Sequence, residues 1–124
     1  MRGVAGLDHV QIAAPPGCEG EARRFFGDVL GLTELEKPPL LALRGGCWFR
    51  AGRHELHIGV ADPFTPSTKA HPALRLSSTA ELSALAARLE AAGSPVVWAD
   101  PTEIPGVARF HTTDPWGNRL EFVA

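Results

Sequence analysis

The chain has 124 residues, 44% hydrophobic and 21% charged, with a formal net charge of −2 at pH 7. This length suits one domain with a hydrophobic core. The charge balance excludes the basic excess of nucleic-acid binding proteins and the acidic runs of disordered tails. No apolar run approaches the roughly 18 residues of a membrane span. The first residues carry Asp8 and His9 in their apolar part, unlike a signal peptide. We therefore expect a cytoplasmic protein without nucleic-acid or membrane partners.

The first half of the chain predicts a strand, a helix and further strands. Residues 7–14 (LDHVQIAA) alternate and are rich in β-formers, which predicts a strand. From Glu21 to Leu30 the apolar residues recur at helical spacing, and Gly31 ends this predicted helix. Short strand-like runs follow as LTELE, LLALR, CWFRA and ELHIGV, before a turn-rich connection, ADPFTPSTKA. Cys18 and Cys47 lack any paired metal-binding spacing and are expected to be reduced thiols.

The second half repeats this order. HPALRLS predicts a strand, and Ser78 with Glu81 forms a capping box that predicts the start of a helix. The helix has an apolar stripe and is closed by Gly93. The stripe consists of Leu82, Leu85, Ala86 and Leu89. PVVWA, ARFHT and RLEFV predict three more strands, the last two joined by a hairpin turn at DPWGN.

The two halves align closely enough to predict a duplicated module. The interval from His9 to Gly31 equals that from His71 to Gly93, 22 positions each. The closing strands LHIGV and LEFVA also align, which places His57 against Glu121. We therefore predict a single domain, residues 1–124, made of two repeated modules at about 5–62 and 68–124.

Strand alternation predicts that polar side chains of both modules share an open face. His9 and Gln11 lie opposite Val10 and Ile12 in the first predicted strand. The same alternation places Glu55 with His57 in the last strand of the first module. In the second module it places His71 and Glu121 opposite apolar neighbours. If the modules pack with pseudo-twofold symmetry, these positions converge, and three imidazoles with one carboxylate suit Zn, Ni, Mn, Co or Fe(II). The alternative is an ordinary sheet face exposed to water.

The chain resembles the vicinal oxygen chelate superfamily over almost its whole length. The resemblance rests on LDHVQIAA, EARRFFGDVLGL, ELHIGV, AHPALRL, LSALAARLEAAG and DPWGNRLEF. The superfamily includes glyoxalase I, methylmalonyl-CoA epimerase, extradiol dioxygenases, fosfomycin-resistance enzymes and bleomycin-resistance proteins. The resemblance implies an α+β fold of two βαβββ modules. Their strands would form a partly open, mixed, barrel-like sheet around a cleft, with the helices outside.

The resemblance also implies a metal site. The metal positions of the superfamily fall on His9, His71 and Glu121, with a fourth ligand in the strand at Glu55 to His57. The repeat alignment favours His57, whereas glyoxalase I-like members have a carboxylate or amide there, which favours Glu55. Glu121 would anchor the metal and lower the charge of the site. Glu55, if it is not a ligand, is a candidate general base, or else a solvated strand residue.

Four further residues are candidates for contacting a substrate. Arg109 and His111 share a face of their strand, where Arg109 would hold a carboxylate or phosphate and His111 would serve as an acid or base. Gln11 shares the face of His9, and Trp48 would stack on an aromatic ligand. The alternative for each is a plain surface or packing role.

Two functions follow from these expectations. The first is a glyoxalase-like, metal-dependent protein that acts on a small molecule with adjacent oxygens, by isomerase, lyase or dioxygenase chemistry. The alternative is a metal-free binding protein of the bleomycin-resistance kind, which sequesters a drug or metabolite. The resemblance also implies a homodimer, in which the metal ligands come from two subunits if the modules swap between chains.

Overall fold

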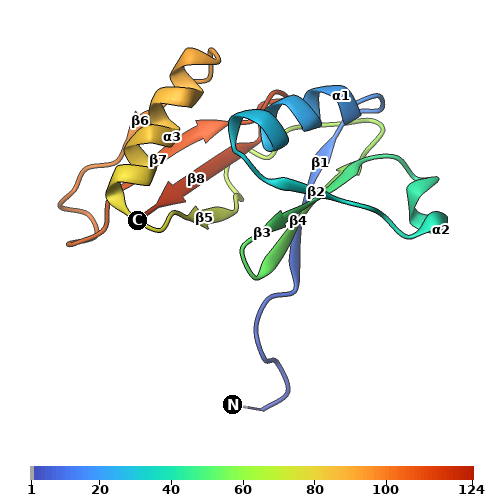
Figure 1. Ribbon diagram of the computed structural model, residues 1–124, viewed down its shortest axis with the longest axis horizontal. Coiled ribbons are helices and arrows are strands. Elements are labelled where there is room, and N and C mark those ends of the chain that lie inside the picture. Colours follow the sequence, from blue (N-terminus) through green and yellow to red (C-terminus); the bar gives the residue numbers. More distant parts are fainter. Residues whose placement is uncertain (1) are drawn as a thin grey trace.

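The computed structural model describes residues 2–124. The first half of the chain forms β1 (His9–Ala14), α1 (Glu19–Ala22), the π-helical segment η1 (Arg23–Val29), β2 (Thr33–Leu35), α2 (Pro39–Ala42), β3 (Cys47–Ala51) and β4 (His54–Val60). The second half forms β5 (Ala73–Arg75), α3 (Thr79–Ala91), β6 (Val97–Trp98), β7 (Arg109–Thr113) and β8 (Arg119–Val123). Figure 1 shows the two halves side by side, each with its own sheet and main helix.

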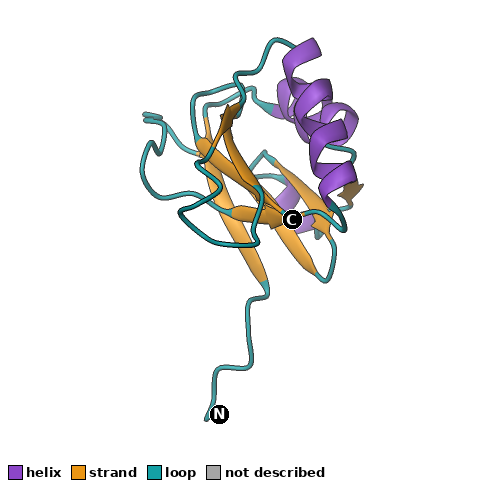
Figure 2. Cartoon of the chain, turned by 90° about the vertical axis from the view of Figure 1, so that its left-hand side faces the viewer, coloured by secondary structure: helices purple, strands orange, loops and turns teal. Residues whose placement is uncertain are grey.

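Both halves have the same strand topology. The strand order is β1-β4-β3-β2 in the first sheet and β5-β8-β7-β6 in the second. In each sheet the first and last strands of the module pair in parallel, and the other pairs are antiparallel. The fold is therefore α+β with two βαβββ modules, as predicted. The strands form two four-stranded sheets and not a closed barrel, and the helices gather on one side of the strands (Figure 2).

The main helices form where the apolar stripes predict them. In the first module α1 continues into η1, where the Leu30 N–H donates to the Phe25 carbonyl, a wider turn than an α-helix makes. In the second module the Ser78 hydroxyl accepts a hydrogen bond from the Glu81 N–H at 3.1 Å, so the predicted helix start is confirmed. All four residues of the predicted stripe of α3 are buried.

The strand predicted at LLALR is wrong, because this segment forms α2 and the turn after it. Pro38 precedes the helix and Pro39 is its first residue, a position that favours proline because the missing N–H has no helical partner there. The same missing N–H makes proline a poor member of a strand ladder. Leu40 and Leu43 are 81% and 85% exposed, so this apolar run is not part of the core.

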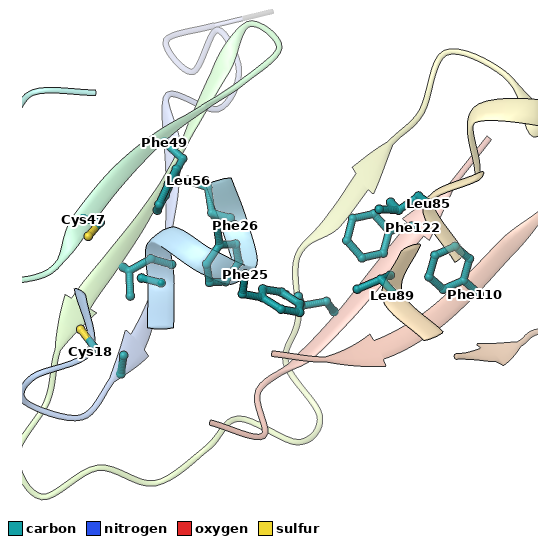
Figure 3. Close-up of a cluster of buried hydrophobic side chains, with 14 of the residues drawn as sticks. Cys18, Phe25, Phe26, Cys47, Phe49, Leu56, Leu85, Leu89, Phe110 and Phe122 are labelled. Carbon is teal, nitrogen blue, oxygen red and sulfur yellow. The ribbon is translucent and has the colours of Figure 1, made fainter. Parts of the chain in front are cut away.

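The core joins the two modules through the first helix. Figure 3 shows Phe25 and Phe26 between side chains of the first sheet and those of the second module. Phe26 is fully buried and packs on Phe49 of β3 and on Trp116 of the loop before β8, with ring centroids 5.7 and 6.3 Å apart. Burial of such large aromatic side chains is the main term that holds the modules together.

Two polar contacts also cross between the modules. The Arg88 Nε of α3 donates to the Val29 carbonyl, and the Asn118 Nδ2 donates to the Ala13 carbonyl of β1 at 2.8 Å. Asn118 is itself buried. The first contact joins α3 to η1, and the second fixes how the start of β8 sits relative to β1.

Cys18 and Cys47 are buried, free thiols of the first module. Within residues 2–124, no helix is long and apolar enough to cross a membrane.

Candidate functional site

The open faces of the two sheets, opposite the helices, carry the predicted site residues. In β1 and β4 the apolar positions face the core. His57 of β4 lies opposite Gln11 of β1, and Gln11 follows His9 by two residues. In the second module, Glu121 of β8 lies opposite Ala73 of β5, and Ala73 follows His71 by two residues. His57 and Glu121 therefore occupy equivalent positions in their modules, as the repeat alignment predicts.

Three side chains of the second module meet on its open face. The Nε2 atoms of His71 and His111 lie 3.0 and 2.9 Å from Oε1 of Glu121. One ligand atom from each residue lies within 4.8 Å of the other two. His71 precedes β5, while His111 and Glu121 are direct neighbours in the β7–β8 ladder. Two imidazoles and one carboxylate with room for further ligands are a typical donor set for a divalent transition metal.

The hydrogen bond on the other side of the His71 ring determines which nitrogen is available. Nδ1 of His71 lies 2.8 Å from the Lys69 carbonyl, which only accepts, so Nδ1 carries the proton. In the neutral ring Nε2 then has a lone pair that faces the Glu121 carboxylate. A lone pair and a carboxylate oxygen repel each other, so this arrangement is favourable only when a proton or a metal cation lies between Nε2 and the carboxylate. A backbone carbonyl on Nδ1 is also the usual support of a metal-binding histidine.

Glu121 is held in its charged form. Its side chain is 13% exposed. Burial alone would raise its pKa, but hydrogen bonds to His71 and His111, with the charges of His111 and Arg109, lower the pKa overall. The Arg109 Nη1 lies 3.7 Å from Oε1 of Glu121. An ionised carboxylate is the form that a cation binds.

The first module forms a stack of three rings on its own open face. His57 lies between Trp48 and His9, with centroid distances of 3.9 and 4.2 Å. Its Nε2 lies 2.9 Å from Oε1 of Glu55, so the two alternative fourth ligands are hydrogen-bonded to each other. Trp48 therefore packs on a protein side chain in this structure.

His9, at the outer end of this stack, is oriented like His71. Its Nδ1 lies 2.8 Å from a carboxylate oxygen of Asp8, which leaves Nε2 for another partner. Gln11 folds over Gly59, where a Cβ would lie 2.6 Å from the Gln11 amide. Glycine at this position thus gives Gln11 the room to lie flat on β4.

A cavity of about 920 Å³ separates the two modules. It lies between the edge strands β1 and β5 and is lined by polar and apolar residues of both modules. The polar residues of its wall include His9, Gln11, Glu55, His71, Arg75 and Arg119. His57, His111 and Glu121 do not line it, so the cavity borders only some of the predicted site residues.

The structure brings the predicted site residues together in two groups. His71 and Glu121 lie with His111, which was expected to contact substrate, while His9 and His57 lie with Glu55 and Trp48. No group of three metal donors in the described chain combines residues of both modules. Arg109, also a substrate candidate, contacts Glu121 and belongs to the first of these groups.

Arg75 and Arg119 share the open face of the second module, where strand alternation places them, but the sequence did not mark them as candidate site residues. In the strand register, Arg75 lies opposite Val123 and Arg119 lies opposite Thr113. Arg119 shares the face of Glu121 because the two residues are two positions apart in β8.

Comparison with known proteins identifies the family. Residues 6–122 match the family model of the Glyoxalase/Bleomycin resistance protein/Dioxygenase superfamily. The chain belongs to this superfamily. The match spans both modules, so the resemblance predicted from the sequence is confirmed.

Solved structures support the same assignment. A glyoxalase family protein from Bacillus anthracis is 46% identical, with a TM-score of 0.89 over 99% of this chain and 98% of that one. Two others share the fold at lower identity. Lactoylglutathione lyase from Agrobacterium tumefaciens is 22% identical, with a TM-score of 0.72 over 97% and 93% of the two chains. The fosfomycin resistance protein FosX from Listeria monocytogenes is 17% identical, with a TM-score of 0.76 over 98% and 93%. No curated protein matches the chain.

Proposed function

We propose that this superfamily member binds a divalent metal and acts on a small molecule that offers two adjacent oxygens. The reaction is an isomerase, lyase or dioxygenase reaction of the glyoxalase type. The observation that carries the proposal is the meeting of His71, His111 and Glu121 within 4.8 Å, with the Nδ1 proton of His71 engaged by the Lys69 carbonyl.

The residues present fit such an ion. Two Nε2 atoms and an ionised carboxylate provide nitrogen and oxygen ligands and leave positions open for substrate. The ion, when bound, supplies Lewis acidity to the adjacent substrate oxygens. Glu121 offsets its charge, and the Lys69 carbonyl holds the His71 ring in place.

Glu55 is the residue that we propose to move a proton. Its carboxylate borders the cavity, its side chain is 28% exposed, and one of its oxygens is hydrogen-bonded to His57. A carboxylate held in this way, with access to the cleft, suits the abstraction of a proton next to a carbonyl group.

We propose that His9 and His57 complete the metal site in a homodimer. They share the open face of the first module, and within residues 2–124 they form no three-donor group with the second module. The strands β1 and β5 each end their sheets without a further strand partner in the described chain. Pairing the first module of one copy with the second module of another would bring both halves of the ligand set together.

Elemental analysis of protein purified without chelator, followed by titration with Ni²⁺, Zn²⁺ and Mn²⁺, tests the proposal. We expect bound metal in the wild type and a loss of at least about tenfold in affinity in His71→Ala. His54→Ala is the matched control, because His54 is exposed at the start of β4. Equal metal affinity in both variants would contradict the proposed ligands. His9→Ala tests the contribution of the first module.

The cavity between the modules favours a second candidate, a metal-free binding protein. Its volume of about 920 Å³ is large enough for a drug-sized ligand, and much of its wall is apolar. Apolar residues of the wall include Val10, Ile12, Leu74, Leu76 and Phe122. Wild-type protein that binds none of the three cations would favour this candidate.

A further inference from the structure

The open face of the second module carries more positive charge than the chain as a whole. Three arginines, Arg75, Arg109 and Arg119, share this face with Glu121, in a chain whose net charge is −2. Metal ligation by His71, His111 and Glu121 uses none of them. The arginines therefore need an explanation of their own.

Two of these arginines flank one position of β8. Val123 lies opposite Arg75 of β5 on one side and opposite Arg109 of β7 on the other, so the three side chains form a row across the sheet. Adjacent strands lie about 4.8 Å apart, which puts the backbones of the arginines about 10 Å apart. Valine between them is short and apolar, so it offers no charged group of its own to either guanidinium group.

This row lies at a defined distance from the metal-binding residues. Val123 follows Glu121 by two residues, which corresponds to about 6.6 Å along a strand. A ligand held by its adjacent oxygens near Glu121 would thus reach the arginine row with a charged oxygen about five bonds further along its chain.

Arg109 already holds a carboxylate. Its Nη2 lies 2.8 Å from Oε1 of Glu103, which belongs to the loop between β6 and β7. The Arg109 side chain is 15% exposed, whereas Glu103 is 55% exposed and sits at the surface. An exposed glutamate on a largely buried arginine occupies the place that an incoming anion would take.

Arg75 has an unused guanidinium group. It is exposed at the cavity wall, and no side-chain hydrogen bond or ion pair engages it within residues 2–124. Arginine presents a planar fork of donors that matches carboxylate and phosphate groups. With Arg109 it can bind an oxyanion from two sides.

We propose that Arg75 and Arg109 bind an oxyanion group of the substrate, a carboxylate or a phosphate, which displaces Glu103 from Arg109. The inference rests on the proposed function and adds the substrate class. The substrate is an anion whose charged group lies about 6.6 Å from its metal-binding oxygens.

Two probes that differ only in the distant group test the proposal. 2-Oxoglutarate offers adjacent oxygens at one end and a carboxylate at the other, and 2-oxovalerate has a methyl group in place of that carboxylate. With Ni²⁺-loaded protein in calorimetric titrations, we expect 2-oxoglutarate to bind at least about tenfold more tightly than 2-oxovalerate. Phosphate titrated against the same protein distinguishes a phosphate preference from a carboxylate preference.

Variants locate the effect. Arg75→Gln should lower the affinity for 2-oxoglutarate to that for 2-oxovalerate, with Ni²⁺ affinity unchanged. Arg109→Gln should lower it in the same way, and Ni²⁺ affinity is measured beside it because the Arg109 Nη1 lies 3.7 Å from Oε1 of Glu121. Arg24→Gln is the matched control, because Arg24 is an exposed arginine of η1 paired with Glu21. Glu103→Ala should tighten 2-oxoglutarate binding, an effect that a merely structural role of Arg109 would not produce. If Arg109→Gln does not fold, Arg75→Gln still decides, because its side chain is not needed for packing.

The same titrations on chelator-treated protein separate this inference from the metal proposal. Metal binding without discrimination between the probes would overturn the inference and leave the metal site standing. Arginine-dependent binding of 2-oxoglutarate without any metal binding would support the oxyanion site and contradict the metal proposal. If neither the metal nor the probes bind, both proposals fail.

Discussion

His111 and Glu121 are direct neighbours across the β7–β8 ladder, and 2.9 Å separates Nε2 of the histidine from Oε1 of the glutamate. The hairpin turn between the two strands sets this register. A shift of the register by one residue would turn one of the two side chains into the core. The pairing of the proposed ligand His111 with the Glu121 carboxylate thus depends on the turn as much as on the strands.

Removal of His111 tests this relationship. His111→Ala should weaken Ni²⁺ binding by at least about tenfold, because it deletes one of the three donors that already lie together. Metal titration with His54→Ala as the control measures the effect. Unchanged affinity would mean that His111 acts on substrate or on Glu121 instead.

We expect Glu19, which lies outside the candidate metal site, to make the stability of the fold depend on pH. Its Oε2 accepts a hydrogen bond from the Gly46 N–H at 2.7 Å, and this bond is the main cause of the lowered pKa of Glu19. Glu19→Ala should lower the free energy of unfolding by about 1–3 kcal/mol, since it leaves the buried Gly46 N–H without its partner. Urea unfolding measures the loss.

The sign of the pH effect follows from the direction of the pKa shift. A carboxyl group with a lowered pKa in the folded state stabilises the protein above its unfolded value, 4.5, and this stabilisation is lost as the pH falls through the folded value. The difference between wild type and Glu19→Gln should therefore shrink as the pH falls below 4.5. A difference that grows in acid would contradict this assignment.

Phe26 should be the most costly single truncation at the contact between the modules. It is fully buried and packs on both Phe49 and Trp116. Phe26→Ala should lower the free energy of unfolding by about 3–5 kcal/mol. Leu40→Ala, at an exposed leucine, should change it by less than about 0.5 kcal/mol. Chemical unfolding followed by tryptophan fluorescence compares the two.

Asn118 has a structural role that a carboxylate cannot fill. Its Nδ2 donates to the Ala13 carbonyl and to Oδ2 of Asp114, and its Oδ1 accepts from the Ser67 N–H. Asn118→Asp would remove both donated bonds and place two buried carboxyl groups in contact. We expect a loss of about 3 kcal/mol or more at neutral pH. The loss should diminish in acid, where the two groups share a proton.

The sequence predicted the modules and the faces of their strands, because apolar alternation and helical spacing depend on local order. It did not predict which residues on an open face meet, since that depends on strand register. His111 was assigned to substrate for this reason, and Arg75 was given no role although strand alternation places it on the open face. The strand prediction for LLALR was wrong because the leucine pattern suits a strand, whereas the two prolines before it start a helix.

Asn118, the last residue of the turn segment DPWGN, shows a second limit of prediction from sequence. The sequence indicated a hairpin turn, which the structure confirms, but the contact of Asn118 with Ala13 spans most of the chain. Tertiary hydrogen bonds of this kind leave no local signal. The same is true of the stack of Trp48 on His57, which depends on the pairing of β3 with β4.

The two thiols of the first module provide a built-in reporter of its opening. Cys18 and Cys47 are 2% and 1% exposed, and burial raises the pKa of Cys47 to about 11. In the native state neither sulfur meets a reagent, and Cys47 is not ionised at neutral pH. A maleimide dye will therefore label the chain only as fast as this module unfolds. The second module contains no cysteine, so the labelling rate reports the unfolding of the first module alone.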